Sequence, residues 1–151
     1  MAVTTFKAIS RKLPQGLAVE SESRGFKIVM DEPEALGGTD TGMNPVEAVL
    51  AALGSCQCIV AAAFAKARRI DLQDIWIEVE GDLDPDGFLK GKEGVRNGFQ
   101  EIRMRLHIVS DSPPEEVEAF ADFIASRCPV EDNLLHKTQV RSETVVEAPS
   151  N

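Results

Sequence analysis

Three cysteines are the residues best suited to chemistry in this chain of 151 residues. Cys56 and Cys58 are two positions apart in a helical segment, about 200° apart around its axis, so they cannot form a disulfide or share a metal ion. Cys56 and Cys128 each lie beside a helix-breaking residue, Gly54 and Pro129, and folding can bring them into contact. Two thiols that meet in this way can take part in redox chemistry. The alternative is that both are small buried side chains, the commonest role of a free cysteine.

The pattern of cysteines and histidines does not predict a metal site. There is no C-x-x-C pair, and His107 and His136 belong to different predicted elements, so no spacing matches structural zinc. We therefore expect no metal. Three cysteines leave at least one thiol free and are too few for a disulfide-stapled secreted fold, which indicates a reducing compartment. The first residues lack the apolar run of a signal peptide, so we expect a cytoplasmic protein.

The overall composition narrows the function further. With 16 basic and 25 acidic residues the net charge is −9, which argues against a nucleic-acid binder, because phosphate recognition needs clustered lysine and arginine. The chain is 43% apolar and 27% charged, which excludes a disordered protein and fits one domain over residues 1–151. Residues 48–65 carry no charge, but their many alanines, with Gly54, Ser55 and Gln57, predict a buried helix and not a membrane span.

The first half of the chain predicts strands followed by a long helix. Residues 2–9 and 16–31 are interpreted as strands, and the apolar run Phe26–Met30 predicts a strand covered on both faces. A glycine-rich loop then leads to the segment Asn44-Pro45-Val46-Glu47, which has the pattern of a capping box with proline at the first helical position. The helix is predicted to continue to about Arg69. That length is comparable to the diameter of the domain, so the helix is the central element.

The second half predicts two half-exposed strands and a second helix. Apolar and polar residues alternate over 75–80 and 102–108, so each strand has one face in water. Four glycines within residues 84–98 predict a long loop. A helix is predicted to begin at Ser112, with Glu115 completing a second capping box. Its apolar stripe contains Val117, Phe120, Ile124 and Cys128.

Pro129 separates this helix from a shorter one. Proline disfavours helical geometry at the preceding residue, so the second helix is predicted to end near Cys128. The same proline can open a short helix that continues to Leu135, with Cys128 at its N-cap. Residues 138–147 predict a last strand. The fold class is therefore α+β, with an N-terminal sheet, a long central helix, further strands and a second helix.

Four motifs around the thiols carry a resemblance to a known family. They are Gly37-Gly38, Asn44-Pro45-Val46-Glu47, Ala51-Ala52-Leu53-Gly54-Ser55-Cys56 and Arg127-Cys128-Pro129-Val130-Glu131. Together they resemble the OsmC/Ohr family of thiol-dependent hydroperoxide reductases, over residues 21–140 and chiefly its broad OsmC-like branch. The resemblance implies an OsmC-like fold and an intertwined homodimer, in which the long helices pack at the centre and the sheets wrap outside.

The resemblance also implies a reaction. Cys56, on the central helix, would attack the peroxide, and Cys128 would resolve the product as a disulfide that a dithiol then reduces. The implied partners are a second copy of the chain, a small organic hydroperoxide and a dithiol reductant. The reaction needs no metal or organic cofactor, and neither nucleic acid nor membrane is implied.

Activation of Cys56 requires a cation, because this residue lies about three turns into its helix, where the dipole no longer lowers a thiol pKa. Family peroxidases use an arginine from the N-terminal strand region, held by a glutamate directly after the Asn-Pro pair. Here Val46 occupies that position and the acid follows at Glu47. Arg24 is the candidate arginine, with Arg11 as the alternative. Helix capping by Glu47, and surface exposure of both arginines, are the alternative interpretations.

Other assignments stay open at this point. Cys128 is a competing nucleophile, because the start of the short helix and Arg127 would favour its thiolate, whereas Glu131 and Asp132 would oppose it. A second function is a weakly active or non-catalytic dimer that binds a small apolar or sulfur-containing ligand in the same cleft. A third interpretation treats all three thiols as core side chains.

Overall fold

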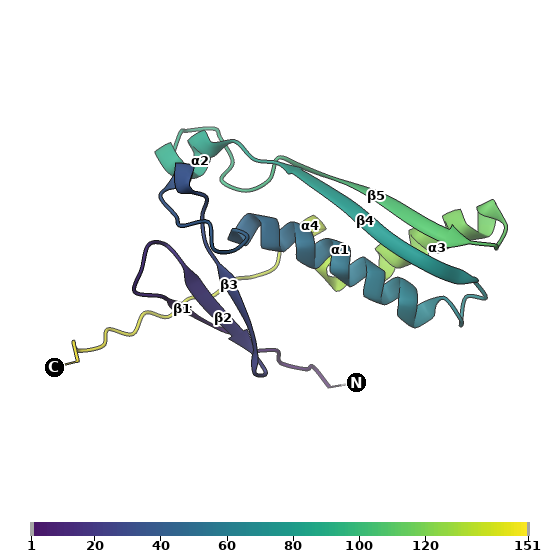
Figure 1. Cartoon of the computed structure of the whole chain (residues 1–151), viewed down its shortest axis with the longest axis horizontal. Helices are drawn as coiled ribbons and strands as arrows, with labels where there is room; N and C mark the ends of the chain where they lie inside the picture. The colour runs from purple at the N-terminus through teal and green to yellow at the C-terminus, as the bar shows by residue number, and fades with distance from the viewer. Residues whose placement is uncertain (1, 151) are drawn as a thin grey trace.

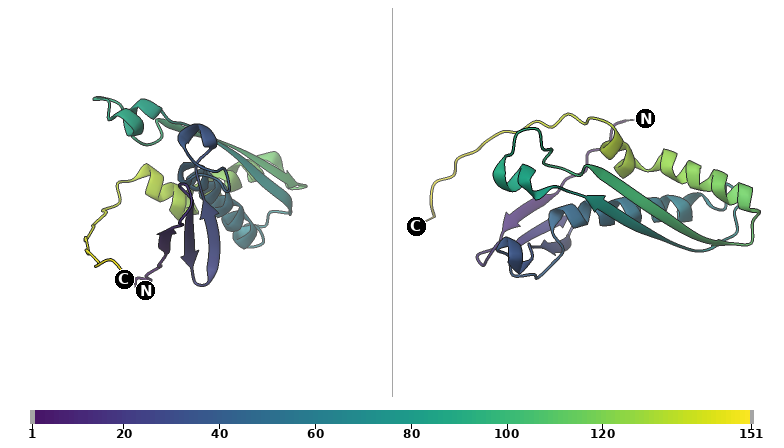
Figure 2. Two further views of the ribbon diagram at one scale, coloured as in Figure 1. Left: turned by 60° about the vertical axis from the view of Figure 1, so that its left-hand side comes forward. Right: turned by 90° about the horizontal axis from the view of Figure 1, so that it is seen from above.

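The computed structural model describes residues 2–150, which form an elongated α+β fold (Figure 1). The elements are β1 (Ile9–Lys12), β2 (Val19–Ser23), β3 (Phe26–Met30), the 3-10 helix η1 (Glu34–Leu36), α1 (Pro45–Phe64), β4 (Leu72–Asp82), α2 (Pro85–Lys90), β5 (Glu101–Ser110), α3 (Pro114–Arg127) and α4 (Pro129–Leu135). A three-stranded sheet precedes α1, and a two-stranded ribbon of β4 and β5 lies over that helix (Figure 2). The predicted fold class is confirmed.

Strands β1, β2 and β3 form an antiparallel meander. The β2–β3 hairpin turns at Arg24 and Gly25, whose φ angles of 53° and 87° are the left-handed pair that a tight hairpin favours. Two predictions for this sheet are wrong. The first strand begins at Ile9 and not at residue 2. Strand β3 is not covered on both faces, since Phe26 is 72% exposed and only Met30 is partly buried.

One buried carboxylate organises the segment between β3 and α1. Asp31 is 2% exposed and accepts hydrogen bonds from the backbone and hydroxyl groups of Thr39 and Thr41 and from the Glu32 N–H. These bonds, led by that of the Thr39 hydroxyl, hold the pKa of Asp31 well below its usual range because they stabilise the charged form. The predicted glycine-rich loop is therefore an ordered turn that leads to Asn44.

Helix α1 begins as the sequence predicts. The Asn44 side chain accepts from the Glu47 N–H at 2.9 Å, and the Glu47 carboxylate accepts from the Asn44 N–H at 2.8 Å, which confirms the capping box. The predicted end at Arg69 is wrong: α1 ends at Phe64, residues 65–69 form turns, and Arg69 has a φ of 59°. By length and hydropathy alone α1 could span a membrane, but it packs against β4, α3 and α4.

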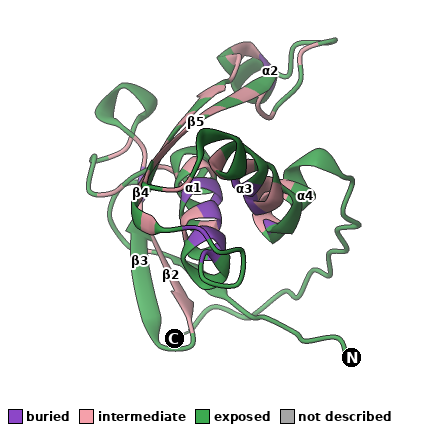
Figure 3. Cartoon of the chain, turned by 90° about the vertical axis from the view of Figure 1, so that its right-hand side faces the viewer, coloured by how far each residue is buried: buried purple, intermediate pink, exposed green. Residues whose placement is uncertain are grey.

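The core lies between α1, α3 and the inner face of the β4–β5 ribbon (Figure 3). Its buried members are Val60, Ala61, Ala65, Ile70, Phe120 and Ile124. Gly54 allows α1 to approach β4 closely, since a Cβ there would lie 3.3 Å from Val79 Cγ2. The outer side of α1 is open, and Ile59 is 68% exposed. Within one protomer the helix is therefore covered on one side only, and its burial on the other side stays a prediction that concerns a second copy of the chain.

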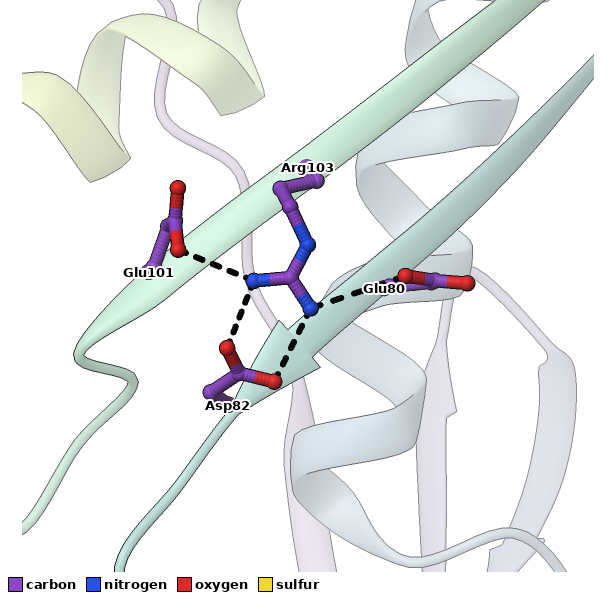
Figure 4. A network of polar contacts seen from close by, with 4 residues as sticks. All are labelled: Glu80, Asp82, Glu101 and Arg103. Atoms are coloured by element: carbon purple, nitrogen blue, oxygen red, sulfur yellow. Dashed lines mark hydrogen bonds and ion pairs between the residues drawn. The ribbon is translucent and has the colours of Figure 1, made fainter.

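Strands β4 and β5 pair antiparallel and show the predicted alternation of half-buried and exposed residues. A polar cluster lies where the ribbon opens into the segment between the strands (Figure 4). Arg103 contacts Asp82 at 2.5 and 2.9 Å, Glu101 at 3.0 Å and Glu80 at 3.5 Å. Hydrogen bonding to Asp82, and then to Glu101, raises the pKa of the guanidinium. The cluster holds both ends of the connecting segment together.

The connecting segment contains a helix that its glycine content did not predict. The Asp84 carboxylate caps the first turn of α2, and Gly91 ends the helix with a φ of 60°. Gly87 is required inside it, because a Cβ there would lie 2.7 Å from the Arg96 carbonyl oxygen. The prediction of an irregular loop over residues 84–98 is therefore wrong for its first half. The second half is a loop that carries Arg96.

Two further predictions for the C-terminal half are wrong. The predicted capping box does not start α3: its N-cap is Pro113, and the Ser112 hydroxyl instead accepts from the Asp71 N–H at 2.9 Å. Residues 138–147 form no strand with any part of the described chain and are exposed. The remaining predicted order is confirmed, with Pro129 opening α4 directly after α3.

Candidate active site

Cys56 and Cys128 meet in the folded chain. Cys56 is half-buried on α1, whereas Cys128 is 2% exposed at the junction of α3 and α4. Their thiols are neighbours in the folded chain, and Cys56 acts on the pKa of the Cys128 thiol. All three cysteines of the chain are free, so the pair is a dithiol and not a disulfide. The structure therefore brings together the two sulfur atoms that the sequence singled out.

Two helices set the position of Cys128. Its backbone is extended, with φ −82° and ψ 107°, as the residue before a proline prefers, and this geometry ends α3. Its sulfur accepts from the Glu131 N–H at 3.3 Å and so caps α4, which confirms the predicted N-cap. One turn earlier in α3, Ile124 is fully buried in the core. The sulfur is thus held from both sides.

The surroundings of Cys128 disfavour its thiolate. Burial raises the pKa of the Cys128 thiol, and the adjacent Cys56 raises it further, whereas the backbone N–H groups at the start of α4 act in the opposite direction. On balance the pKa is raised, so Cys128 is protonated at neutral pH. This argues against the alternative in which Cys128 attacks first. Arg127, on which that alternative relied, stacks 5.4 Å from the centroid of the Phe123 ring.

A buried amide next to Cys56 belongs to the same site. Gln57 is fully buried, and its Nε2 donates to the Glu131 carboxylate at 2.7 Å. Glu131 therefore contacts the neighbour of one thiol through its side chain and the other thiol through its backbone N–H. This bond was not predicted from the sequence. The only signal for it was a polar glutamine within the charge-free residues 48–65, and it was interpreted as lowering the hydropathy of that segment.

A cleft of about 480 Å³ lies along the face of α1 that carries Cys56. The helix contributes Val46, Val49 and Leu53 to its wall. These residues follow one another and Cys56 at intervals of three and four positions, which places all of them on one face of the helix. The other walls come from α4 and from the segment that leads into β5.

The cleft is largely apolar but carries charged groups. Glu131 lines it and also contacts Gln57, which connects the cleft to the thiol pair. Arg96 lines it from the loop that leads into β5. Within residues 2–150 its guanidinium has no ion pair or hydrogen bond. An arginine without an acidic partner is chemically suited to stabilise a thiolate or to bind a peroxide oxygen that enters the cleft.

Comparison with known proteins identifies the fold and its relatives. The sequence profile of the family described as OsmC-like protein matches residues 38–143. The chain belongs to the OsmC-like protein family. A protein of Mycoplasma genitalium named hydroperoxide reductase is 31% identical over 134 residues, which cover 86% of each chain. A protein of the same name from Mycoplasma pneumoniae is 26% identical over 137 residues, 88% of this chain and 89% of that one.

Solved OsmC structures share the fold. The crystal structure of an OsmC-like protein from Mycoplasma pneumoniae superposes with a TM-score of 0.78 and is 23% identical, with 89% of each chain covered. An organic hydroperoxide resistance protein OsmC from Legionella pneumophila superposes with a TM-score of 0.63 and is 22% identical, with 89% of this chain and 91% of that chain covered. At these identities the similarity establishes the fold alone.

In this OsmC-like protein, Glu47 is directed away from the thiol pair. Its carboxylate and backbone complete the cap of α1 with Asn44. Its position on the helix is about 180° from that of Cys56, and it lines a different cleft, together with Cys58. Val46, directly after the Asn-Pro pair, is the residue that lines the cleft on the Cys56 side. The position of Glu47 therefore supports capping and not contact with the reactive thiol.

The two arginines proposed from the sequence lie in the N-terminal sheet. Arg24 is at the tip of the β2–β3 hairpin, with its guanidinium 5.5 Å from the centroid of the Phe26 ring. Arg11 is exposed on β1. Neither forms a hydrogen bond or ion pair with α1 within residues 2–150 of the protomer. Arg96, which the sequence analysis did not single out, is the arginine that lines the cleft.

Cys58 occupies separate surroundings between α1 and β4. It lines a cleft of about 710 Å³ whose wall includes Gly54 and Trp76. Burial raises the pKa of the Cys58 thiol. Cys58 therefore faces a different side of α1 from Cys56. In the part of the chain that the structure describes, no three His, Cys, Asp or Glu side chains are grouped so as to hold a metal ion.

Proposed function

We propose that this protein reduces organic hydroperoxides with Cys56 and Cys128. The observation that carries the proposal is the contact between two free thiols, one of them on the face of the central helix that carries a cleft. Two relatives over most of the chain are named hydroperoxide reductase, which supports the same chemistry. A role in defence against peroxides follows from this activity.

The reaction has two steps and a regeneration. The Cys56 thiolate attacks a peroxide oxygen, the O–O bond breaks, the leaving alkoxide takes up a proton to become an alcohol, and Cys56 becomes a sulfenic acid. The Cys128 thiol then attacks the Cys56 sulfur, which forms the disulfide and releases water. An external dithiol reduces this disulfide and is itself oxidised to a disulfide. The cycle requires no metal or organic cofactor.

The surroundings of the two thiols support this division of roles. Cys128 is buried, its pKa is raised, and it is suited to react second, when a sulfenic acid is already beside it. Cys56 is half-buried and shares a helix face with the cleft. We assign thiolate stabilisation to Arg96, because it lines this cleft without an acidic partner in the described residues. Arg24 and Glu47 are the alternative supporting residues implied by the family resemblance.

The active form that we propose is a cytoplasmic homodimer. Apolar residues lie uncovered on β3 and on the outer side of α1, with Phe26 72% and Ile59 68% exposed. Apolar surface of this kind is typical of an interface, and a second copy of the chain is the proposed cover. Three free cysteines favour a reducing compartment.

A second candidate function is binding without turnover. The cleft beside Cys56 has Val46 where the resemblance places an acid, and its walls are largely apolar. A dimer of this kind would hold a small apolar or sulfur-containing ligand in the cleft. This function is favoured if the protein binds such a ligand and consumes no peroxide.

Peroxide consumption tests the proposal directly. With cumene hydroperoxide as substrate and dithiothreitol as reductant, we expect catalytic consumption by the wild-type protein and almost none by Cys56→Ser. Cys58→Ser is the matched control and should keep wild-type turnover, because Cys58 lies in a different cleft. A Cys56→Ser variant that kept full turnover would refute the proposed role of this thiol.

A further inference from the structure

We propose that Gln57 is a positioning residue for the resolving thiol, because its hydrogen bond to Glu131 holds Cys128 against Cys56. The inference rests on the proposed function and assigns a residue to its second step. The bond joins residues that adjoin the two thiols: Gln57 follows Cys56 in α1, and Glu131 donates its N–H to the Cys128 sulfur. A single side-chain contact therefore connects the two reactive segments of the chain.

The short helix α4 has little else to hold it in place. None of its residues is buried, and Leu135 at its end is 72% exposed. The buried group at this end of the chain is its N-cap, Cys128. An element without buried apolar side chains gains little stability from packing. The hydrogen bond of Gln57 to Glu131, at 2.7 Å, is therefore a principal attachment of the first turn of α4 to α1.

Packing alone does not explain a glutamine at position 57. Its side chain is fully buried, and its Oε1 is the buried side-chain oxygen that has no hydrogen-bond partner in the described part of the chain. Burying an amide with an unmet acceptor is unfavourable, whereas leucine, of similar size, would be buried without that penalty. The favourable interaction that Gln57 makes is the bond from its Nε2 to Glu131.

Loss of this bond should slow the second step of the reaction far more than the first. Cys56 lies in the middle of α1, which packs against β4 and α3, so a shift of α4 leaves the Cys56 sulfur in place although it can alter one wall of the cleft. Disulfide formation requires the Cys128 sulfur to approach the Cys56 sulfur in line with the S–O bond that breaks. A small displacement of a reacting group can slow a reaction by about a hundredfold. A residue with a merely structural role would change both steps together with the stability of the fold.

The test measures the two steps separately in the full-length protein. Reduced protein is treated with cumene hydroperoxide or with diamide, which converts two thiols into a disulfide without a peroxide. The Cys56–Cys128 disulfide is followed over time by quenched alkylation and mass spectrometry. Sulfenic acid formation at Cys56 is measured in a Cys128→Ser background. The variants are Gln57→Leu, Glu131→Ala and Glu131→Gln, with Asp132→Ala as the control in the same turn of α4.

We expect Gln57→Leu and Glu131→Ala to form the disulfide at least about tenfold more slowly with both oxidants. Sulfenic acid formation should be slowed much less than disulfide formation, because Cys56 itself is held by α1. Since α4 also forms a wall of the cleft, the diamide reaction, which needs no peroxide site, gives the deciding comparison. Glu131→Gln keeps an oxygen that can accept from Gln57 and should restore most of the rate. Asp132→Ala removes an exposed acid that pairs with His136 and should leave the rate unchanged.

Disulfide formation at the wild-type rate in folded Gln57→Leu or Glu131→Ala would overturn the inference. If Gln57→Leu does not fold, Glu131→Ala decides, because that side chain is only partly buried. The diamide reaction separates this outcome from a failure of the proposed function. A wild-type protein that is inert to hydroperoxides but is oxidised by diamide would refute peroxidase activity, and the diamide rates of the variants would still decide the role of Gln57.

Discussion

Cys56 and Cys58 are two residues apart on α1 and have different partners: the Cys56 thiol contacts Cys128, whereas Cys58 lines the cleft under β4. The separation of about 200° around the helix accounts for this difference. One helix therefore carries a thiol that can take part in dithiol chemistry and a second thiol that is excluded from it. Each can be replaced without direct effect on the surroundings of the other.

The acidity of Cys128 should depend on Cys56. Cys56 is the second cause, after burial, of the raised pKa of Cys128. We therefore expect Cys56→Ala to shift the pH profile of Cys128 alkylation toward lower pH, while burial keeps the pKa above its ordinary value. Alkylation at each cysteine, resolved by mass spectrometry over a range of pH, measures the shift. Cys58→Ala is the control and should leave the profile unchanged; an unshifted profile in Cys56→Ala contradicts the assigned cause.

Arg96 should matter more for peroxide reduction than Arg24. Arg96 lines the cleft along the face of α1 that carries Cys56, and Arg24 lies at the tip of a hairpin. A hydrogen bond from a charged donor contributes about 1.5–3 kcal/mol, so we expect Arg96→Ala to lower kcat/KM by about tenfold or more, with partial recovery in Arg96→Lys. Steady-state kinetics with cumene hydroperoxide measure this effect.

The matched variant Arg24→Ala should keep a kcat/KM within about twofold of wild type if Arg96 of the same protomer is sufficient to activate Cys56. The reverse result, a large loss in Arg24→Ala and none in Arg96→Ala, would assign activation of Cys56 to the hairpin arginine. That outcome would require the hairpin of the partner subunit to reach the cleft.

Glu47 should contribute to stability and not to turnover. Its carboxylate caps α1, and its position is on the opposite side of the helix from Cys56. Loss of an N-terminal cap costs about 0.5–2 kcal/mol, so Glu47→Ala and Asn44→Ala should both lower the free energy of unfolding by amounts in that range. Urea denaturation measures the loss. Peroxidase activity per folded molecule should be the same in both variants, and a specific loss of activity in Glu47→Ala would indicate a catalytic role.

Asp31 should make the protein sensitive to acid. Hydrogen bonds from Thr39, Glu32 and Thr41 hold its pKa below the ordinary value. Because the folded-state pKa is the lower one, the stabilisation is present above about pH 4 and is lost as the pH falls through the folded-state value. Asp31→Asn should therefore be less stable than wild type at pH 7, and the difference should shrink below about pH 4. Urea denaturation at several pH values measures this trend.

Asp40→Asn is the matched control for Asp31→Asn. Asp40 is exposed in the same segment and has a φ of 53°, a conformation that asparagine also adopts readily. The free energy of unfolding of Asp40→Asn should equal that of the wild-type protein at every pH. A constant difference between Asp31→Asn and wild type from pH 7 to pH 3 would contradict the role given to the Asp31 carboxylate.

Features that depend on neighbouring residues could be predicted from the sequence. The cap of α1 at Asn44 and the sulfur cap of α4 at Cys128 are each made by side chains within three positions, so their patterns are sufficient. The meeting of Cys56 and Cys128 is a long-range contact that spacing alone only permits. It was predicted because the motifs around both thiols resemble a family in which the two react.

Features that depend on distant partners were missed. Nothing near Gln57 in the sequence indicates that Glu131 is its partner, because the bond crosses from α1 to α4. For α2 the sequence does contain the residues typical of a helix start, Asp84 and Pro85, and of a helix end, Gly91. A loop was predicted instead because the segment is rich in glycine. Strand β3 pairs with β2 but has the composition of a strand covered on both faces, and nothing within the described protomer covers it in that way. The segment 138–147 has the composition of a strand and pairs with no strand of the described protomer.

Ile124 is fully buried one turn before Cys128, at the end of α3. The position of the Cys128 sulfur therefore depends on the packing of apolar side chains in the core, and not on groups that face the solvent. Substitution of Ile124 by another aliphatic residue is therefore limited by two requirements, the stability of the core and the position of the Cys128 sulfur. Removal of a single methylene group there would be expected to affect both the stability of the core and the position of the sulfur.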